Sequence, residues 1–363
     1  MTTQNESLAA ANLSRLRDSL GSAALDRVRT MELIKRKRLK TSRDEDLRDR
    51  TGELLEGLVT RFDPELAGDA DNRIEARALL VLGETGAGKS WTLRRFFAEH
   101  PSFPGYGRLK SDCPLITVSV KPPCTFLALG RQVAARTGYP IEGKLEAHAI
   151  WDRVYQRLQF RGIFGVHFDE LHNFVRTANK NDRQEVQNII KTLMNMTDWP
   201  VFVVVSGLPM LKEFVEEACE DRRRLRVVHF ARLASPDDNA KIKAVLRALA
   251  TVANLTLSKE TVDFIVPRLM HAALYALGTC MELMHEAIDG VLRKGKRELD
   301  AIAFANAYAA RTACHAAANP FLVGNWSSLD CSKVLMRDAD TSIVRTGADP
   351  VGVAAASPGG TSR

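Results

Sequence analysis

The sequence has no apolar run long enough to span a membrane, and its first 30 residues are polar and charged, without the apolar core of a signal peptide. It also lacks C-x-x-C pairs, and its eight histidines show no metal-ligand spacing. The six scattered cysteines therefore predict reduced, mostly buried thiols rather than a disulfide framework or a zinc site. These absences favour a cytoplasmic globular protein, and 363 residues suit one large or two moderate domains.

Acidic residues are outnumbered by basic ones. The chain has 51 lysines and arginines against 44 acidic residues, which gives a net charge of +7. A basic excess favours an acidic partner such as nucleic acid, although many basic proteins bind none. The charge is densest at residues 27–43 and 222–226. Within the first stretch, Lys35–Arg43 is a candidate for contact with DNA phosphates.

A complete phosphate-binding loop, G-x-x-x-x-G-K-S, occupies residues 83–90. An apolar strand at 78–82 precedes it and a helix at 90–98 follows, which is the context that the motif needs. Its backbone N–H groups would wrap the phosphates, Lys89 would add a positive charge, and Ser90 would ligate Mg²⁺. The predicted contacts with ATP are Gly83, Glu84, Thr85, Gly86, Ala87, Gly88, Lys89, Ser90, Trp91 and Asp169.

An apolar run at 162–168 ends in two acids, Asp169 and Glu170. Such a run is typical of a buried parallel strand, and ligands bind at the carboxyl ends of strands in open α/β sheets. Asp169 is the candidate that holds Mg²⁺ through its water shell, and Glu170 the one that orients and activates the attacking water. Together with the phosphate loop, this pair predicts an ATPase with ATP and Mg²⁺ as cofactors.

The pattern of strands and helices predicts the architecture. Strands at 78–82, 114–120, 163–168, 200–206 and 227–231 alternate with helices, which predicts a five-stranded parallel sheet with helices on both faces. From residue 235 no strand is evident, and four helical segments follow: 236–253, 258–268, 272–293 and 298–313. They predict a small all-helical lid domain.

Domain boundaries follow from the same pattern. Residues 1–62 form a charged helical extension, of which 44–62 should pack on the core. The ATPase core spans 63–234 and the helical lid 235–318. The last segment, 319–363, is predicted to be a mostly disordered tail.

Two further features are candidates for the active site. Ser206 ends the strand at 200–206 and is placed to sense the γ-phosphate or the water, with a simple strand-end turn as the alternative. A cluster of arginines precedes the strand at 227–231, where an arginine finger would complete a neighbour's site. A solvated basic turn or a DNA contact is equally consistent with this cluster. Its members are Arg222, Arg223, Arg224 and Arg226.

The residues around these motifs resemble a known family. Asp-Glu-x-His-Asn-Phe at 169–174, Leu-Met-Asn at 193–195 and Val-Val-Val-Ser-Gly-Leu-Pro at 203–209 look like the TniB/TnsC group of transposition ATPases, with MuB and IstB more distant. The resemblance runs from about residue 40 to Asn319-Pro320-Phe321. The sensor segment Ser206-Gly207-Leu208 departs from the more usual Gly-Thr-Pro.

This resemblance implies an AAA+ P-loop fold, ATP-dependent rings or filaments on duplex DNA, target-site selection and activation of a cognate transposase. The partners expected are duplex DNA, the transposase and further copies of the chain, at the nucleoid of a bacterial cell and without a membrane. In such rings, loops after the second strand line the pore. Lys121 is therefore a further candidate for DNA contact, and an ordinary exposed lysine is the alternative.

Other functions remain open from the sequence. Another DNA-associated AAA+ ATPase, such as a helicase, clamp loader or initiator, would share both nucleotide motifs, although no winged-helix segment is evident after the lid. A STAND-type signalling ATPase would also share them, but those usually carry long repeat domains. His172 and Asn173 either begin a loop or position Glu170. No arginine lies at 278–281, where many related ATPases have a second sensor.

Overall fold

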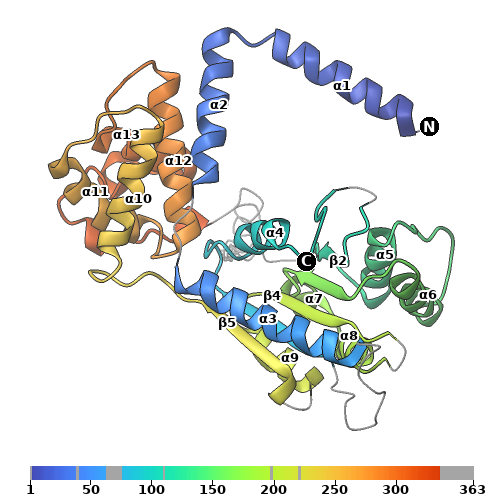
Figure 1. Ribbon diagram of the computed structural model, residues 1–363. Coiled ribbons are helices and arrows are strands. Elements are labelled where there is room, and N and C mark those ends of the chain that lie inside the picture. The colour runs from blue at the N-terminus through green and yellow to red at the C-terminus, as the bar shows by residue number, and fades with distance from the viewer. Residues whose placement is uncertain are drawn as a thin grey trace, which may run out of the picture.

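The computed structural model describes residues 2–37, 41–62, 76–108, 111–196, 199–219 and 222–335 (Figure 1). At its centre lies a five-stranded sheet in the order β2-β3-β4-β1-β5, with every neighbouring pair parallel. The predicted parallel sheet is confirmed, and each strand lies within two residues of its expected bounds. The strands are β1 (Ala78–Gly83), β2 (Leu115–Ser119), β3 (Gly165–Asp169), β4 (Phe202–Gly207) and β5 (Leu225–Phe230).

Helices cover both faces of this sheet, which explains why β1, β3 and β4 are buried at every position. One face shares a core with α5 (Phe126–Arg136), α6 (Ala147–Phe160), α8 (Lys180–Asn195) and α9 (Leu211–Cys219). The other face packs against α3 (Ser42–Phe62) and α4 (Lys89–Glu99). A short helix that the sequence did not predict, α7 (His172–Thr177), follows β3.

A second, all-helical domain follows β5 and has its own core. Its helices are α10 (Asn239–Val252), α11 (Lys259–Ala272), α12 (Leu277–Arg293) and α13 (Ala301–Thr312). The four predicted lid helices are confirmed, but α11 continues past its predicted end at residue 268 to Ala272, and α12 begins at Leu277 rather than at residue 272. Two successive residues with positive φ, Leu274 (52°) and Tyr275 (60°), then turn the chain into α12.

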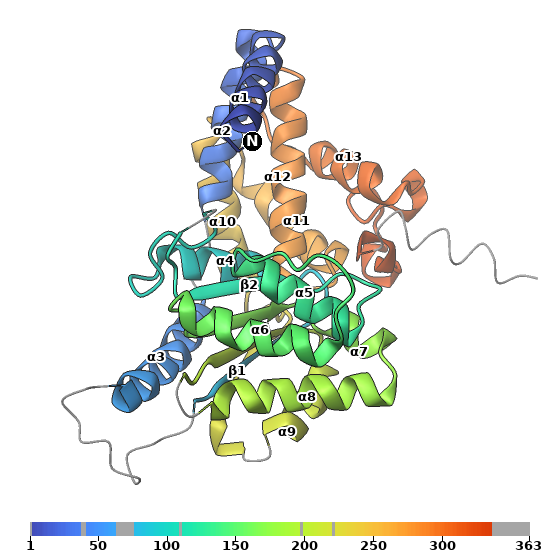
Figure 2. The same cartoon turned by 90° about the vertical axis from the view of Figure 1, so that its right-hand side faces the viewer.

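The N-terminal helices attach to different domains. Helix α3 buries Leu47 and Leu54 against the sheet, as predicted. Helix α2 (Ser22–Arg36) instead packs on the lid, where Met31 and Ile34 join the lid core beside α10 and α12. Helix α1 (Thr2–Asp18) projects beyond α2 (Figures 1 and 2), and its described side chains are exposed. The N-terminal extension therefore connects the lid with the core.

Part of the segment assigned to the tail packs on the lid. Phe321, Cys331 and Val334 are buried in the lid core. The Asn319 side-chain amide donates a 2.9 Å hydrogen bond to the Ala305 carbonyl. Residues 336–363 of the predicted disordered tail lie outside the described residues.

All six cysteines are free thiols, and five of them are buried. Among the described helices, none is both long and apolar enough to cross a membrane.

Candidate nucleotide-binding and hydrolysis site

The phosphate loop joins the carboxyl end of β1 to the amino end of α4. Gly86 and Gly88 have φ angles of 77° and 89°, which residues with side chains rarely adopt. The Nζ atom of Lys89 lies inside the loop and donates to the carbonyls of Gly83 (2.8 Å) and Glu84 (3.1 Å). Burial lowers the pKa of this ammonium, although nearby carboxylates oppose the shift. The loop thus closes around a positive charge at a helix amino terminus, an arrangement that binds phosphates.

Asp169, the last residue of β3, accepts two hydrogen bonds on one carboxylate oxygen. The Ser90 hydroxyl donates to Oδ1 over 3.0 Å, and the Ser206 hydroxyl donates to it over 2.6 Å. These residues come from α4, β3 and β4, whose ends meet at the carboxyl edge of the sheet. A hydroxyl beside a carboxylate supplies the hard oxygen ligands that Mg²⁺ prefers, so Ser90 and Asp169 fit this ion.

A chain of hydrogen bonds continues from Ser206 across the sheet. His167 Nε2 lies 2.9 Å from the Ser206 hydroxyl, and His167 Nδ1 lies 3.1 Å from the Thr117 hydroxyl. The Thr117 hydroxyl in turn lies 2.5 Å from that of Tyr106. Burial lowers the pKa of His167 to about 4, so its ring is neutral near pH 7. One ring nitrogen is then a hydrogen-bond donor and the other an acceptor.

The carboxylate at one end fixes the direction of every proton in this chain, because a carboxylate only accepts. Ser206 gives its proton to Asp169, and therefore accepts from the protonated Nε2 of His167. Nδ1 of the neutral ring is then an acceptor, and Thr117 donates to it. The Tyr106 hydroxyl donates to Thr117. We call this series the Tyr106 relay; its members are Tyr106, Thr117, His167, Ser206 and Asp169.

Glu170 turns away from β3 with a φ of 59°, and its side chain is 37% exposed. A residue that activates water needs such access. Its carboxylate lies 3.5 Å from His172 Nε2. Burial is the main cause that lowers the pKa of His172 to about 4. A Cβ at Gly207 would lie 2.9 Å from the His172 ring, so this glycine makes room for it. Of the two interpretations of His172, this contact favours the one in which it positions Glu170.

The lid contacts the phosphate loop directly. The Thr279 N–H donates to the Gly86 carbonyl over 3.1 Å. Gly278 packs so closely that a Cβ there would lie 2.5 Å from the same carbonyl oxygen. The amino end of α12 therefore faces the loop, although no sensor residue is predicted in this segment. In the sequence, the glycine at position 278 is a signal that could have indicated this close approach.

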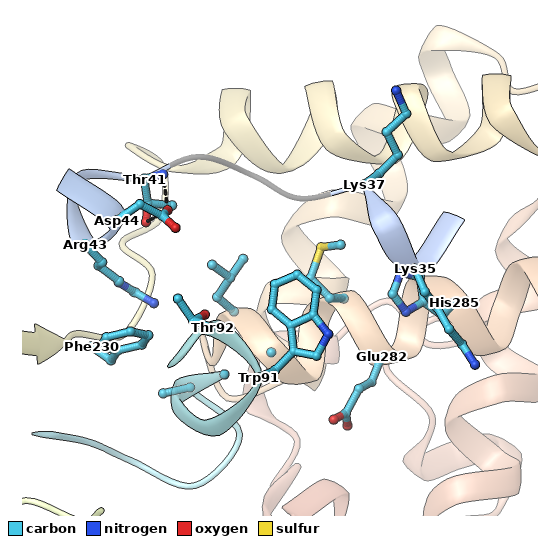
Figure 3. Close-up of a pocket in the computed structure, with 15 residues that line it drawn as sticks. Lys35, Lys37, Thr41, Arg43, Asp44, Trp91, Thr92, Phe230, Glu282 and His285 are labelled. Atoms are coloured by element: carbon cyan, nitrogen blue, oxygen red, sulfur yellow. Dashed lines mark hydrogen bonds between the residues drawn. The ribbon is translucent and has the colours of Figure 1, made fainter. Parts of the chain in front are cut away.

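A cavity of about 290 Å³ opens beside the phosphate loop, between α4, the lid and the adjoining ends of α2 and α3 (Figure 3). Apolar side chains of Trp91, Phe230, Leu277 and Met281 line it next to the loop backbone. Ser90 and Asp169 line a different cleft. A nucleotide with its phosphates on the loop thus has an apolar space for its base. Trp91 lies in this wall, whereas the sequence did not indicate the other three side chains.

The basic stretch that was a candidate for DNA contact lies largely at this cavity. Lys35, Lys37 and Arg43 line it. Arg43 also donates to the Ala231 carbonyl, and burial lowers its pKa. Arg38 and Lys40 lie outside the described residues. Lys121 is exposed just beyond β2.

The arginine cluster lies at the amino end of β5, whereas the phosphate loop follows the carboxyl end of the parallel strand β1. It therefore cannot reach the site of its own chain. Arg226 pairs with Glu53 of α3, and Arg224 donates to the Asn195 side chain over 2.9 Å. These two arginines join elements of their own chain. Arg223 is exposed, and the side chain of Arg222 lies outside the described part of the chain.

Residues 59–229 match a known family, whose model is described as "Bacterial TniB protein". Over this segment, which is less than half of the chain and is called the TniB segment below, the chain is similar to the TniB family. The TniB segment includes the phosphate loop, Asp169, Glu170, Ser206 and the arginine cluster, so the resemblance predicted from the sequence is confirmed. None of the curated proteins compared with the chain matches it.

Solved structures with a similar fold are ATPases of the AAA+ class. Cdc6p from Pyrobaculum aerophilum has a TM-score of 0.50 at 13% identity, over 75% of this chain and 67% of its own. ORC1 from Aeropyrum pernix, solved with DNA, has a TM-score of 0.47 at 17% identity, over 72% and 65%. RuvB from Thermotoga maritima, a Holliday junction branch migration motor, has a TM-score of 0.39 at 12% identity, over 80% and 73%. The chain thus spans about two thirds of the first two structures. With its sheet order, the TniB segment has the AAA+ P-loop fold.

Proposed function

We propose that this protein is an ATPase that regulates DNA transposition. It binds ATP and Mg²⁺, assembles with further copies on duplex DNA, selects target sites and activates a cognate transposase at the bacterial nucleoid. The main observation in support of ATPase activity is that four side chains lie together at one edge of the sheet: Lys89, Ser90, Asp169 and Glu170. The match of residues 59–229 to the TniB family supports the role in transposition, and the net charge of +7 supports DNA binding.

Each side chain of the site has a distinct task in hydrolysis. Lys89 neutralises charge on the β- and γ-phosphates, and Ser90 and Asp169 would hold Mg²⁺, which would supply further positive charge beside the phosphates. Glu170 accepts a proton from the attacking water. Neutral His172 keeps Glu170 oriented, and Ser206 holds Asp169 in place.

Two substitutions test the ATPase. Lys89→Ala removes the charge inside the phosphate loop, so binding of a fluorescent ATP analogue should be lost. Glu170→Gln should keep this binding and lower the turnover number by a factor on the order of 10², because the base is removed. Lys144→Ala and Glu142→Gln change exposed residues outside the site and serve as controls. Hydrolysis at the wild-type rate in Glu170→Gln would contradict the assignment.

Assembly on DNA is tested with a labelled duplex, by anisotropy and sedimentation, with ATP, with ADP and without nucleotide. We expect ATP to promote assembly, and affinity to fall with salt because phosphate contacts release counterions. Binding that responds to neither nucleotide nor salt would favour a protein-binding switch of the STAND type. Strand separation of the duplex would favour a helicase.

The arginine finger that an adjacent subunit would supply is tested by mixing variants. Arg222→Ala or Arg223→Ala should lower hydrolysis while the isolated subunit still binds ATP. Mixing that variant with Glu170→Gln protein should restore some activity, since a mixed interface combines an intact base with an intact arginine. No recovery in any mixture, with a monomer at all ATP concentrations, would rule out a site shared between subunits.

A further inference from the structure

A second large cleft runs along β2, which is one of the two edge strands of the sheet, and has a volume of about 610 Å³. Ser90 and Asp169 lie at its inner end, so it begins at the hydrolysis site. Its walls come from α4, the segment before β2, and the carboxyl ends of α5 and α6. These separate elements contribute five arginines: Arg94, Arg108, Arg136, Arg157 and Arg161.

The positive charge of this cleft is not balanced. Asp169 is the single carboxylate among the described residues of the lining, and it already accepts two hydrogen bonds. Arg161 lies 3.3 Å from Asp112, but that aspartate is 94% exposed, so water screens the pair. Arg94, Arg108 and Arg136 are exposed, and none forms an ion pair with another described residue. A concave surface with several uncompensated charges of one sign attracts an anion.

Two arginines at the outer end are held in place. The Arg157 guanidinium lies over the rings of Tyr139 (5.2 Å) and Phe160 (4.9 Å). Its Nε is buried and has no hydrogen-bond partner in the described part of the chain. Arg161 donates to the Ser111 carbonyl over 3.3 Å. Side chains fixed in this way lose little entropy when they bind a ligand.

We propose that this arginine cleft binds successive phosphates of a DNA backbone. The inference rests on the proposed function and assigns the surface that touches DNA. Guanidinium groups bind phosphate oxygens in a forked geometry, and hydroxyls of Ser111 and Ser119 add donors along the same wall. The volume suits a short segment of one strand rather than an enclosed duplex. Carboxylates of an acidic peptide can bind the same guanidinium groups, so such a peptide is the alternative that a competition experiment must test.

Tyr106 makes the cleft a regulatory site as well. It lines the cleft and it begins the relay that ends at Asp169. A phosphate beside Tyr106 offers its hydroxyl a charged acceptor in place of Thr117, and charge-assisted hydrogen bonds are the stronger ones. Occupation of the cleft therefore changes the hydrogen bond that Thr117 gives to His167, and through Ser206 the support of Asp169. DNA bound here alters the rate of hydrolysis.

Charge reversal tests the binding site. Arg108→Glu and Arg136→Glu alter exposed side chains, so the fold should persist, as circular dichroism will check. Arg153→Glu, on the exposed side of α6, is the matched control with the same change of charge. With ATP present, each cleft variant should bind a labelled duplex about tenfold more weakly. The slope of log affinity against log salt should fall by about 0.9 for each phosphate that the variant no longer neutralises.

The outcomes separate this proposal from the proposed function. If the wild-type protein binds no duplex, the proposed function fails. If it binds, but the cleft variants behave like wild type or Arg153→Glu is equally impaired, only the cleft assignment is overturned. Displacement of DNA by poly-L-glutamate as readily as by single-stranded DNA of equal charge would overturn the preference for phosphate and indicate an acidic protein partner.

Tyr106→Phe tests the regulatory part, because it removes the hydroxyl and keeps the ring. The duplex should still bind, weakened by no more than about tenfold for one lost hydrogen bond, yet the change in turnover number that DNA causes in the wild-type protein should disappear. A purely structural role of Tyr106 would not separate these two readouts. A wild-type response to DNA in this variant would overturn the coupling.

Discussion

The Ser206 hydroxyl donates a 2.6 Å hydrogen bond to the Oδ1 atom of Asp169. Both groups are buried, and they lie on neighbouring strands at register positions that face each other. The sensor candidate therefore contacts the proposed magnesium ligand. Because His167 occupies the other side of the hydroxyl, Ser206 has no freedom to point elsewhere.

Ser206→Ala removes this donor. A hydrogen bond to a charged group contributes about 1.5–3 kcal/mol, so turnover should fall roughly tenfold to a hundredfold while ATP affinity changes little. Steady-state hydrolysis and equilibrium titration with a fluorescent nucleotide measure the two quantities. Ser102→Ala, at an exposed position, is the control. An unchanged turnover number would show that Ser206 has no part in hydrolysis.

Stability should depend on pH between 6.5 and about 4 because of His167 and His172, whose pKa values are both lowered to about 4. In this window the unfolded chain binds more protons than the native one, so the free energy of unfolding rises with pH. The stability that the two neutral histidines contribute is therefore lost as the solution is acidified. Thermal melts from pH 7 to 5 should show a falling melting temperature.

The source of that pH dependence is tested by substitution. His167→Gln and His172→Gln each remove one proton-binding site, so each should flatten the decline of melting temperature between pH 7 and 5. His148→Gln, on α6 outside this network, is the control. An equally steep decline in the double variant His167→Gln/His172→Gln would refute the assignment.

Gly278→Ala should separate the lid from the phosphate loop, because the added Cβ would lie 2.5 Å from the Gly86 carbonyl oxygen. The base cavity loses one wall, and affinity for ATP should fall about tenfold or more. Isothermal titration calorimetry measures this change. Gly290→Ala lies on the same helix with nothing within 4 Å of the new Cβ and should bind normally. Equal affinities in the two variants would show that lid contact is irrelevant to binding.

Arg226→Ala should destabilise the protein rather than act as a finger variant. Its partner Glu53 has a lowered pKa, mainly because of the hydrogen bond from Arg226. Loss of this partly exposed pair should cost about 1 kcal/mol or less, seen as a small drop in melting temperature. Mixing with Glu170→Gln should give no recovery of activity beyond simple dilution. Substantial recovery would make Arg226 the finger after all.

The sequence predicted the parts of the site that are set by local chemistry. Lys89, Ser90 and Asp169 belong to motifs whose spacing alone places them at strand ends, and the structure brings them together. The parallel sheet was equally predictable, since apolar strands alternate with helices along the chain.

Features that depend on distant contacts were not predictable. Arg226 and Glu53 are 173 positions apart, so no spacing rule connects them. The end of α11 is set by positive φ angles at Leu274 and Tyr275, residue types that give no turn signal. The sequence does not indicate the role of His167, because its partners lie on two other strands.

The lid is joined to the core through two separate stretches of the same chain. One runs from β5 to α10, and the other runs from α2, which belongs to the lid core, to α3, which belongs to the sheet core. A domain joined by one chain connection can rotate about many axes. A domain joined by two connections rotates mainly about the axis that passes through both. We therefore expect the base cavity to open by rotation of the lid about one axis.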